Sequence, residues 1–311
     1  MLIRDFNTLK QTVKIHKSGA WDAFAPFVQD AQRFYIEPYL GVKLIAMLEQ
    51  LIDSGVPEDT PQEKKDLLDL SIRALGPLSY ALAAHESSIG FGDAGHTVAR
   101  TDTVAPASDE KVKSAKETAL YRGWQNLEYL LVFLEENEYK FLDWRASRYI
   151  KTPQSKYFRT AIDFQELGMV DISYSRLTYE KLLQLIRRIE MTKVADMIQM
   201  NISDPFAKTL SDKLKTLISY IRPYIASRVA ELHTSQTTKE QRTLESSDKP
   251  EFKAVIRPLY DDLADTGNYY GEQADYWEAK IIELLADEFG IDSSGKLDWN
   301  SKEKKLFSDI G

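Results

Sequence analysis

Residues 5–9 read DFNTL, and residues 163–167 read DFQEL, 158 positions later (163 − 5). Keeping that offset pairs a set of apolar positions in the first half, 24, 27, 28 and 31, with 182, 185, 186 and 189. Both sets have the i, i+3, i+4, i+7 spacing of one helix face. The sequence therefore predicts that each half opens with a short extended segment, a loop and an amphipathic helix.

Further along the chain the offset shortens to 146 (223 − 77). It pairs Leu75 with Ile221 and Pro77 with Pro223, all inside helical patterns. A proline inside a helix removes one backbone hydrogen bond and kinks the helix, so two prolines at matching places favour a common origin. We expect residues 52–63, IDSGVPEDTPQE, to form an exposed loop that accounts for the change of 12 in offset.

Each half is expected to close with one more helix, at about 109–139 with Ser108 as N-cap and at about 270–289 with Gly290 as a stop. A repeat this long indicates domain duplication, because solenoid repeats span about 20–50 residues. A chance likeness between amphipathic helices is the alternative. Six residues are expected to hold matching structural places: Trp21, Tyr179, Phe6, Phe164, Pro77 and Pro223.

The predicted fold is mostly α, with two tandem, related helical-bundle modules. The first covers 1–146 and the second 161–311, with a linker at 147–160 where Pro153 suits a boundary. In the first module, residues 89–108 contain three glycines and then a strand-like alternation, which predicts an extended arm or β-hairpin. Residues 235–253 are more polar and are expected to form a mobile loop or a disordered insertion.

Composition limits the class of protein. The chain has 311 residues, 43% of them hydrophobic, and a net charge of −8. An acidic balance does not attract the nucleic-acid backbone, so no specific nucleic-acid binding is expected. Because there are no cysteines, disulfides and thiolate metal sites are excluded. No signal peptide and no membrane span are expected from the apolar pattern.

Catalytic motifs are not recognisable. The letters GFGDAG at 90–95 match G-x-G-x-x-G, but they follow a helical run and precede a strand-like one, which is the wrong context for a dinucleotide fingerprint. The four histidines lack metal-ligand spacing, and the carboxylates lie among charges on predicted helices. We therefore expect no enzyme activity, no cofactor and no metal. The aromatic residues from Trp124 to Trp144 are expected to fill a core, with a subunit interface as the alternative.

A resemblance rests on two stretches. The stretch AQRFYIEPYLG at 31–41 resembles the opening helix and Y-L-G turn of the small helical head–tail connector proteins of tailed bacteriophages. The stretch 159–190 resembles a family of proteins of about 300 residues found among structural genes of phages and prophages of Bacteroidales. The second module departs from the connector pattern, because Met197-Ile198-Gln199 stands where the first has Tyr39-Leu40-Gly41.

The resemblance implies a virion structural protein, assembled in the bacterial host cytoplasm, that forms a homo-oligomeric neck ring between portal and tail proteins. DNA would only pass through the ring. The arm is the expected contact with a neighbouring subunit, through Phe91, His96, Val98, Arg100, Thr101 and Val104. The alternatives are a tail or baseplate component, and a soluble helical ligand-binding protein or enzyme with a pocket between the modules.

Overall fold

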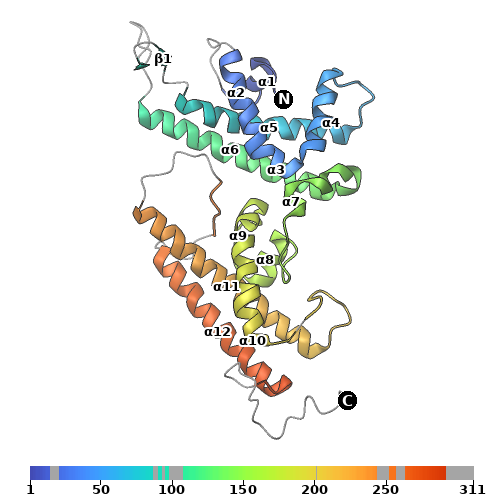
Figure 1. The fold of residues 1–311 in the computed structure, drawn as a ribbon, viewed down its shortest axis with the longest axis vertical. Helices are drawn as coiled ribbons and strands as arrows, with labels where there is room; N and C mark the ends of the chain where they lie inside the picture. Colours follow the sequence, from blue (N-terminus) through green and yellow to red (C-terminus); the bar gives the residue numbers. More distant parts are fainter. Residues whose placement is uncertain are drawn as a thin grey trace. The chain divides into compact units, whose positions relative to one another are not determined.

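The computed structural model describes residues 1–14, 21–86, 90–92, 95–97, 108–200, 202–243, 252–256 and 263–291 (Figure 1). The chain divides into two compact units. The first comprises Met1–Pro153 and Asp248–Phe252, and the second comprises Gln154–Ser247 and Lys253–Gly311. We call them module 1 and module 2. Both are helical, which confirms the prediction of a mostly α chain with two tandem helical modules.

Module 1 is built around a long helical hairpin of α5 (Gln62–Glu86) and α6 (Asp109–Glu136), which pack along each other (Figure 1). Leucines of both helices are fully buried in this hairpin, among them Leu75, Leu78 and Leu127. The other helices of module 1 are α1 (Phe6–Lys10), α2 (Trp21–Ala31), the π-helix η1 (Gln32–Ile36), α3 (Glu37–Leu40), α4 (Val42–Asp53), the 3₁₀-helices η2 (Glu138–Lys140) and η3 (Leu142–Ala146), and α7 (Arg148–Lys151).

Module 2 has the same plan, with a hairpin of α11 (Asp212–Thr243) and α12 (Leu263–Phe289). Before the hairpin come α8 (Ala161–Gly168), α9 (Arg176–Ile189), the π-helix η4 (Glu190–Val194) and α10 (Ala195–Ile198). One continuous apolar core joins these helices. As α2 packs on α5 in module 1, α9 packs on α11 in module 2.

The strongest sign of a common origin is a pair of π-helices. The first, η1, begins at Gln32, and the second, η4, begins at Glu190, 158 positions later (190 − 32). The short helices α3 and α10 follow at the same offset, and each ends at a residue with positive φ, Gly41 (81°) and Gln199 (46°). Because π-helices are rare, their recurrence at one offset relates the two modules far more specifically than apolar spacing does.

The leading segments of both modules are helical, which corrects the expectation that they are extended. Asp5 caps α1 by accepting a hydrogen bond from the Thr8 amide at 2.8 Å, and Thr160 caps α8 by accepting one from the Asp163 amide at 3.0 Å. These caps are 155 positions apart (160 − 5), three fewer than the offset that the letters DF suggest. The burial of side chains follows the same register, since Leu9 and Phe164 are both fully buried.

The change of offset between the two parts of each module comes from a helix and not from a loop. Module 1 inserts α4, whose last residues are Ile52 and Asp53, and the turn that follows covers only 54–61. In module 2 the described residues of 200–211 form turns and bends. The predicted exposed loop is present at 54–61, two residues shorter at each end than 52–63, because α4 extends to Asp53 and α5 begins at Gln62.

Both closing helices are present, with adjusted bounds. Ser108 stands at the N-cap of α6, but its side chain makes no capping hydrogen bond there. Gly290 follows α12 with a φ of 65°, and the Ile291 amide donates to the Leu285 carbonyl at 3.0 Å, which completes a helix stop. Residues 235–243, expected in a mobile loop, continue α11. The polar composition of these residues favours a loop, although the chain remains helical there.

The expected arm is described only in part. Strand β1 (Gly90–Gly92) pairs antiparallel with β2 (Gly95–Thr97), with Phe91 opposite His96. Residues 89, 93–94 and 98–107 of the arm lie outside the described residues, so the arm as a whole remains a prediction.

Helix α5 bears on the expectation that the chain contains no membrane span. Residues Gln62–Ala84 are long and apolar enough to cross a membrane, but 67% of the apolar 18-residue window within them is buried inside the protein. Core helices of soluble proteins meet the same criteria of length and composition, and α5 forms half of the central hairpin of module 1.

Candidate functional site

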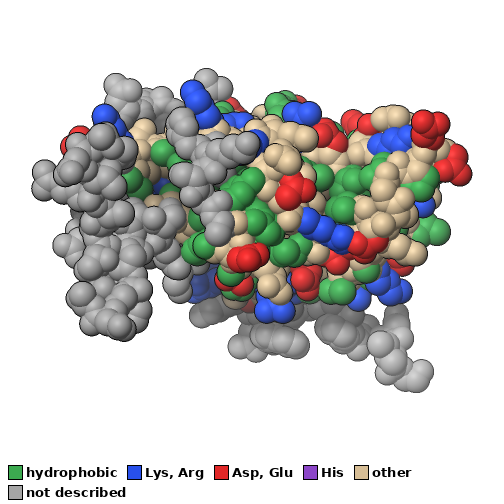
Figure 2. All heavy atoms as spheres, turned by 90° about the horizontal axis from the view of Figure 1, so that it is seen from above, with side chains coloured by type: hydrophobic (Ala, Val, Ile, Leu, Met, Phe, Trp, Pro, Cys, Tyr) green, Lys and Arg blue, Asp and Glu red, His purple; other side chains and the backbone are tan. Residues whose placement is uncertain are grey.

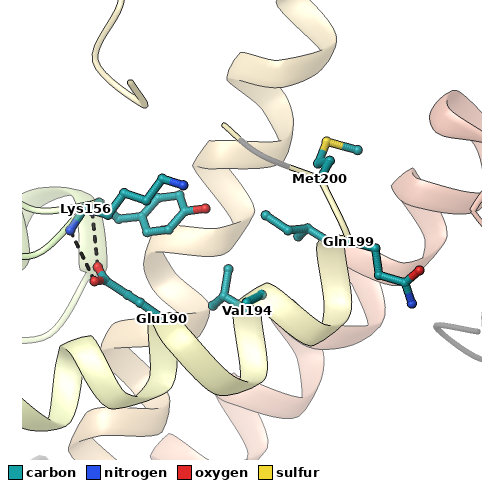
Figure 3. Close-up of a pocket in the computed structure, with 8 residues that line it drawn as sticks. Lys156, Glu190, Val194, Gln199 and Met200 are labelled. Carbon is teal, nitrogen blue, oxygen red and sulfur yellow. Dashed lines mark hydrogen bonds between the residues drawn. The ribbon is translucent and has the colours of Figure 1, made fainter. Parts of the chain in front are cut away.

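A pocket of about 250 Å³ opens on module 2, beside the π-helix η4. Its walls come from the segment that leads into α8, from η4 and α10, and from the two residues that follow α10 (Figure 3). The lining residues are Lys156, Tyr157, Glu190, Val194, Ala195, Ile198, Gln199 and Met200. Most of this wall is apolar, and the side chain of Gln199 points away from Glu190 (Figure 3).

Glu190 forms the polar end of the pocket and is only 9% exposed. Its carboxylate accepts hydrogen bonds from the Ser155 hydroxyl at 2.5 Å and from the amides of Lys156 and Tyr157, each at 3.2 Å. A buried carboxylate needs such donors to compensate for lost hydration. Glu190 therefore fastens the leading segment of module 2 to its π-helix.

Module 1 fastens its leading segment in the same way. Gln32, the counterpart of Glu190, accepts a hydrogen bond from the Leu2 amide at 2.8 Å. Its side-chain amide donates to Glu49 of α4 at 2.8 Å. The first residue of each π-helix thus holds the backbone of the leading segment, and in module 1 it holds α4 as well.

The tyrosines around the pocket and core of module 2 stay protonated. Burial raises the pKa of the Tyr157 hydroxyl, and the nearby Glu190 carboxylate raises it further. Burial also raises the pKa of Tyr224 to about 12. The Tyr157 carbonyl accepts a hydrogen bond from Arg222 Nε at 3.1 Å. This environment supports packing and hydrogen bonding, because a hydroxyl with a raised pKa is a poor base or nucleophile near neutral pH.

The predicted structural residues are distributed over both modules. Phe6 meets Trp21 edge-on at 5.4 Å between ring centroids, and Phe164 lies 6.1 Å from Tyr179. Pro77 lies inside α5 and Pro223 inside α11, and both are buried. Among the predicted interface residues, Phe91 and His96 are backbone register partners in the β1–β2 pair. The others, Val98, Arg100, Thr101 and Val104, lie outside the described residues.

Sequence reasoning missed a group of exposed apolar side chains on module 1. Val42 is 66% exposed, and Leu142 is 63% exposed. They precede Lys43 and Asp143, whose ion pair of 3.7 Å ties α4 to η3. We call Val42, Leu142 and the nearby Tyr139, which is 69% exposed, the apolar edge. Figure 2 shows hydrophobic side chains exposed between charged ones on one face of the molecule.

Helix α6 exposes two more aromatic side chains, Tyr121 at 67% and Tyr129 at 63%. They are eight residues apart, so they point within about 80° of each other around the helix. Aromatic side chains are enriched at protein interfaces. Exposure could not be read from the sequence here, because the same aromatic stretch also contains buried Trp124 and Trp144.

Within the described residues, no group of three or more histidine or carboxylate side chains is arranged to hold a metal ion. A family of unknown function, DUF6712, matches residues 36–154, which is fewer than half of the residues and lies almost wholly in module 1. No curated protein and no solved structure matches the chain.

Proposed function

We propose that the protein is a structural component of a phage virion, a connector that forms a neck ring between the portal and the tail. The observation that carries the proposal is the set of exposed apolar side chains on module 1. Val42, Tyr139 and Leu142 are each more than 60% exposed. Exposed apolar groups of this kind, next to polar residues, are typical of surfaces that bind other subunits.

The two-module plan supports the same function. A closed ring needs two different surfaces on each subunit that fit each other. Two related modules with different surfaces meet that need. The apolar edge is formed by α4 and the segment after α6, and the described residues of module 2 contain no counterpart of α4. A net charge of −8 suits a ring through which DNA passes without being held.

The test is assembly of the purified chain, alone and mixed with a portal protein from the same genome, followed by sedimentation velocity and negative-stain electron microscopy. We expect rings, or decoration of the portal. The substitution Leu142→Glu places a charge on the apolar edge and should abolish assembly while leaving the helical content unchanged. Leu142→Met is the matched control, since it keeps the side chain apolar.

A chain that stays monomeric with and without the portal would contradict the proposal, and so would a Leu142→Glu variant that assembles normally. A second candidate, a soluble ligand-binding protein, is favoured by the pocket beside Glu190. It predicts a monomer whose stability rises when a small molecule is added, which thermal-shift screening measures. A tail or baseplate component is the same class of protein with different neighbours, and gene order distinguishes it.

A further inference from the structure

Helix α8 and the turn after it expose an apolar patch on module 2. Ile162, Glu166 and Met169 are three to four residues apart along α8 and its C-cap, so their side chains lie on one face of the helix. Ile162 is 48% exposed, and Met169 is 67% exposed. Tyr174, which is 45% exposed, donates a hydrogen bond from its hydroxyl to the Glu166 carboxylate and so lies beside them. We call these four residues the α8 patch.

The turn that carries Tyr174 has an unusual backbone. Met169, Ser173 and Tyr174 have positive φ, of 59°, 54° and 54°, although none of them is glycine. Gln165 holds the turn, because its side-chain carbonyl accepts hydrogen bonds from the Ile172 amide at 3.1 Å and from the Tyr174 amide at 2.8 Å. Left-handed backbone costs free energy at residues with side chains, and such residues cluster where side chains are presented for binding.

The equivalent positions of module 1 are exposed as well, but they are polar. The offset of 155 that relates the caps of α1 and α8 pairs the patch residues with polar ones: Ile162 with Asn7, Glu166 with Gln11 and Met169 with Lys14. The buried positions between them are apolar in both modules, as Leu9 and Phe164 show. The shared fold therefore does not require apolar side chains on this face, and those of module 2 indicate a contact that module 1 does not make.

Acidic residues accompany the α8 patch, and basic residues accompany the apolar edge. Residues 160–175 contain three acidic residues and no lysine or arginine. Residues 139–153, which include two of the three residues of the apolar edge, contain four basic residues and one acidic residue. Two of the four basic side chains, those of Lys140 and Arg145, are paired with carboxylates of module 1. The remaining positive charge belongs to α7.

Helix α7 begins beside the apolar edge. Gly41 and Ser147 are in close contact, because a Cβ added to Gly41 would lie 3.1 Å from the Ser147 Cα. Val42 and Arg148 follow them directly in the sequence. Arg148 and Lys151 are exposed, and neither forms an ion pair within the part of the chain that the structure describes. The apolar edge is thus bordered by positive charge that is available to a partner.

We infer that the α8 patch binds the apolar edge of a second copy of this chain. The apolar side chains of the patch pack on those of the edge, and Arg148 and Lys151 face the carboxylates of α8 and its turn. Apolar burial supplies affinity, and opposite charges fix the orientation. Because the two surfaces differ and belong to one chain, the contact is heterologous and repeats from copy to copy. It rests on the proposed function, since it supplies the contact between neighbouring subunits of the ring.

Mixing two defective variants tests the inference. Leu142→Glu removes the edge and leaves the patch, whereas Met169→Lys removes the patch and leaves the edge. Met169→Lys also gives the patch the residue of module 1, whose positive charge would face a basic surface. We expect the wild-type chain to self-associate in sedimentation velocity, and each variant alone to have a dissociation constant at least about tenfold larger. An equimolar mixture should form a one-to-one dimer, because one intact edge then meets one intact patch.

Met191→Lys is the matched control, because it makes the same substitution at a side chain of module 2 that is 71% exposed and lies outside the patch. It should self-associate as the wild type does. Added salt should weaken the wild-type contact, since the charges lie at the surface. Circular dichroism equal to that of the wild type shows that a variant is folded.

The inference is wrong if the wild-type chain stays monomeric at about 100 μM, if Met169→Lys associates as well as Met191→Lys, or if the mixed variants form no dimer. These outcomes are distinct from failure of the proposed function. A monomeric chain that still decorates the portal would remove this contact and keep the connector. A chain that associates through patch and edge, but forms neither rings nor portal decoration, would keep this contact and contradict the neck ring.

Discussion

The two π-helix segments, 32–41 in module 1 and 190–199 in module 2, have the same backbone plan and different chemistry. Both run from a π-helix through a short α-helix to a residue with positive φ. Gln32 in the first is Glu190 in the second, and Gly41 is Gln199. The comparison teaches that one backbone plan can be stabilised by different side chains in the two modules.

The two helical hairpins also share a backbone plan and differ in the side chains that join their helices. In module 2, Arg228 of α11 binds Asp275 at 2.7 Å and Glu278 at 3.2 Å on α12. At the offset of 146, the position of Arg228 corresponds to Leu82 of α5, which is half-buried and apolar. One hairpin is therefore joined partly by charges where the other is joined by side-chain packing.

The largest effect is expected from Gly41→Ala. Gly41 has φ of 81° and ψ of 151°, a conformation that is nearly confined to glycine, and an added Cβ would lie 3.1 Å from Ser147 Cα. We expect a loss of about 3 kcal/mol of stability in module 1. Amide exchange in α3 and α4 measures it, because a chain of two modules need not unfold in a single transition. An unchanged exchange rate in α3 and α4 would show that the turn at Gly41 does not require glycine.

Glu190→Gln should have the next largest effect. The carboxylate accepts from three donors, and an amide in its place would turn an N–H₂ group toward at least one of them. We expect module 2 to lose about 2 kcal/mol of stability. Urea unfolding followed by exchange in α8 and η4 measures the loss. Asp196→Asn, at an exposed position on α10, is the control and should change little.

Arg228→Ala should destabilise the hairpin of module 2 by about 1 to 2 kcal/mol, because three carboxylates lose their partner. Arg228→Leu copies the residue of module 1 and should cost less, since it restores packing. The midpoint of thermal unfolding of module 2 distinguishes them. Equal losses in the two variants would mean that packing at this position contributes nothing.

The smallest effect is a gain. Gln199 has a left-handed conformation with φ of 46° and ψ of 20°, which costs free energy for any residue with a side chain. Gln199→Gly restores the residue of module 1 and should stabilise module 2 by about 0.5 to 1 kcal/mol. Thermal unfolding of the single variant measures the gain, and a clear loss of stability would contradict the equivalence of the two turns.

Much of the architecture could be predicted from the sequence, because helix faces repeat with a period that apolar residues reveal. The offset of 158 found the pairs Val28 with Ile186 and Ala31 with Ile189, and all four are buried. The letters DF predict an offset of 158 between the leading helices, but the N-caps and the buried side chains align at an offset of 155. The N-cap and the buried side chains determine which residues correspond, and the shared DF letters do not. Three residues make nearly one helical turn, so Phe6 and Phe164 still meet similar partners.

The pocket could not be predicted, because its walls come from two segments more than 30 residues apart, at Lys156 and at Glu190. Nothing in the sequence around Glu190 marks a buried carboxylate among many exposed ones. Local patterns also miss the π-helices, since a π-turn differs from an α-turn by one hydrogen-bond register and not by composition. Once one π-helix is known, however, the same offset along the sequence leads to the other.

An experimentally determined structure of the full-length chain tests the central claim most directly. The account predicts that the backbone of 24–41 superposes on that of 182–199 without a gap, with a π-helix at the same place in both. Backbones that diverge within these ranges, or a π-helix in one module alone, would contradict the common origin of the two modules.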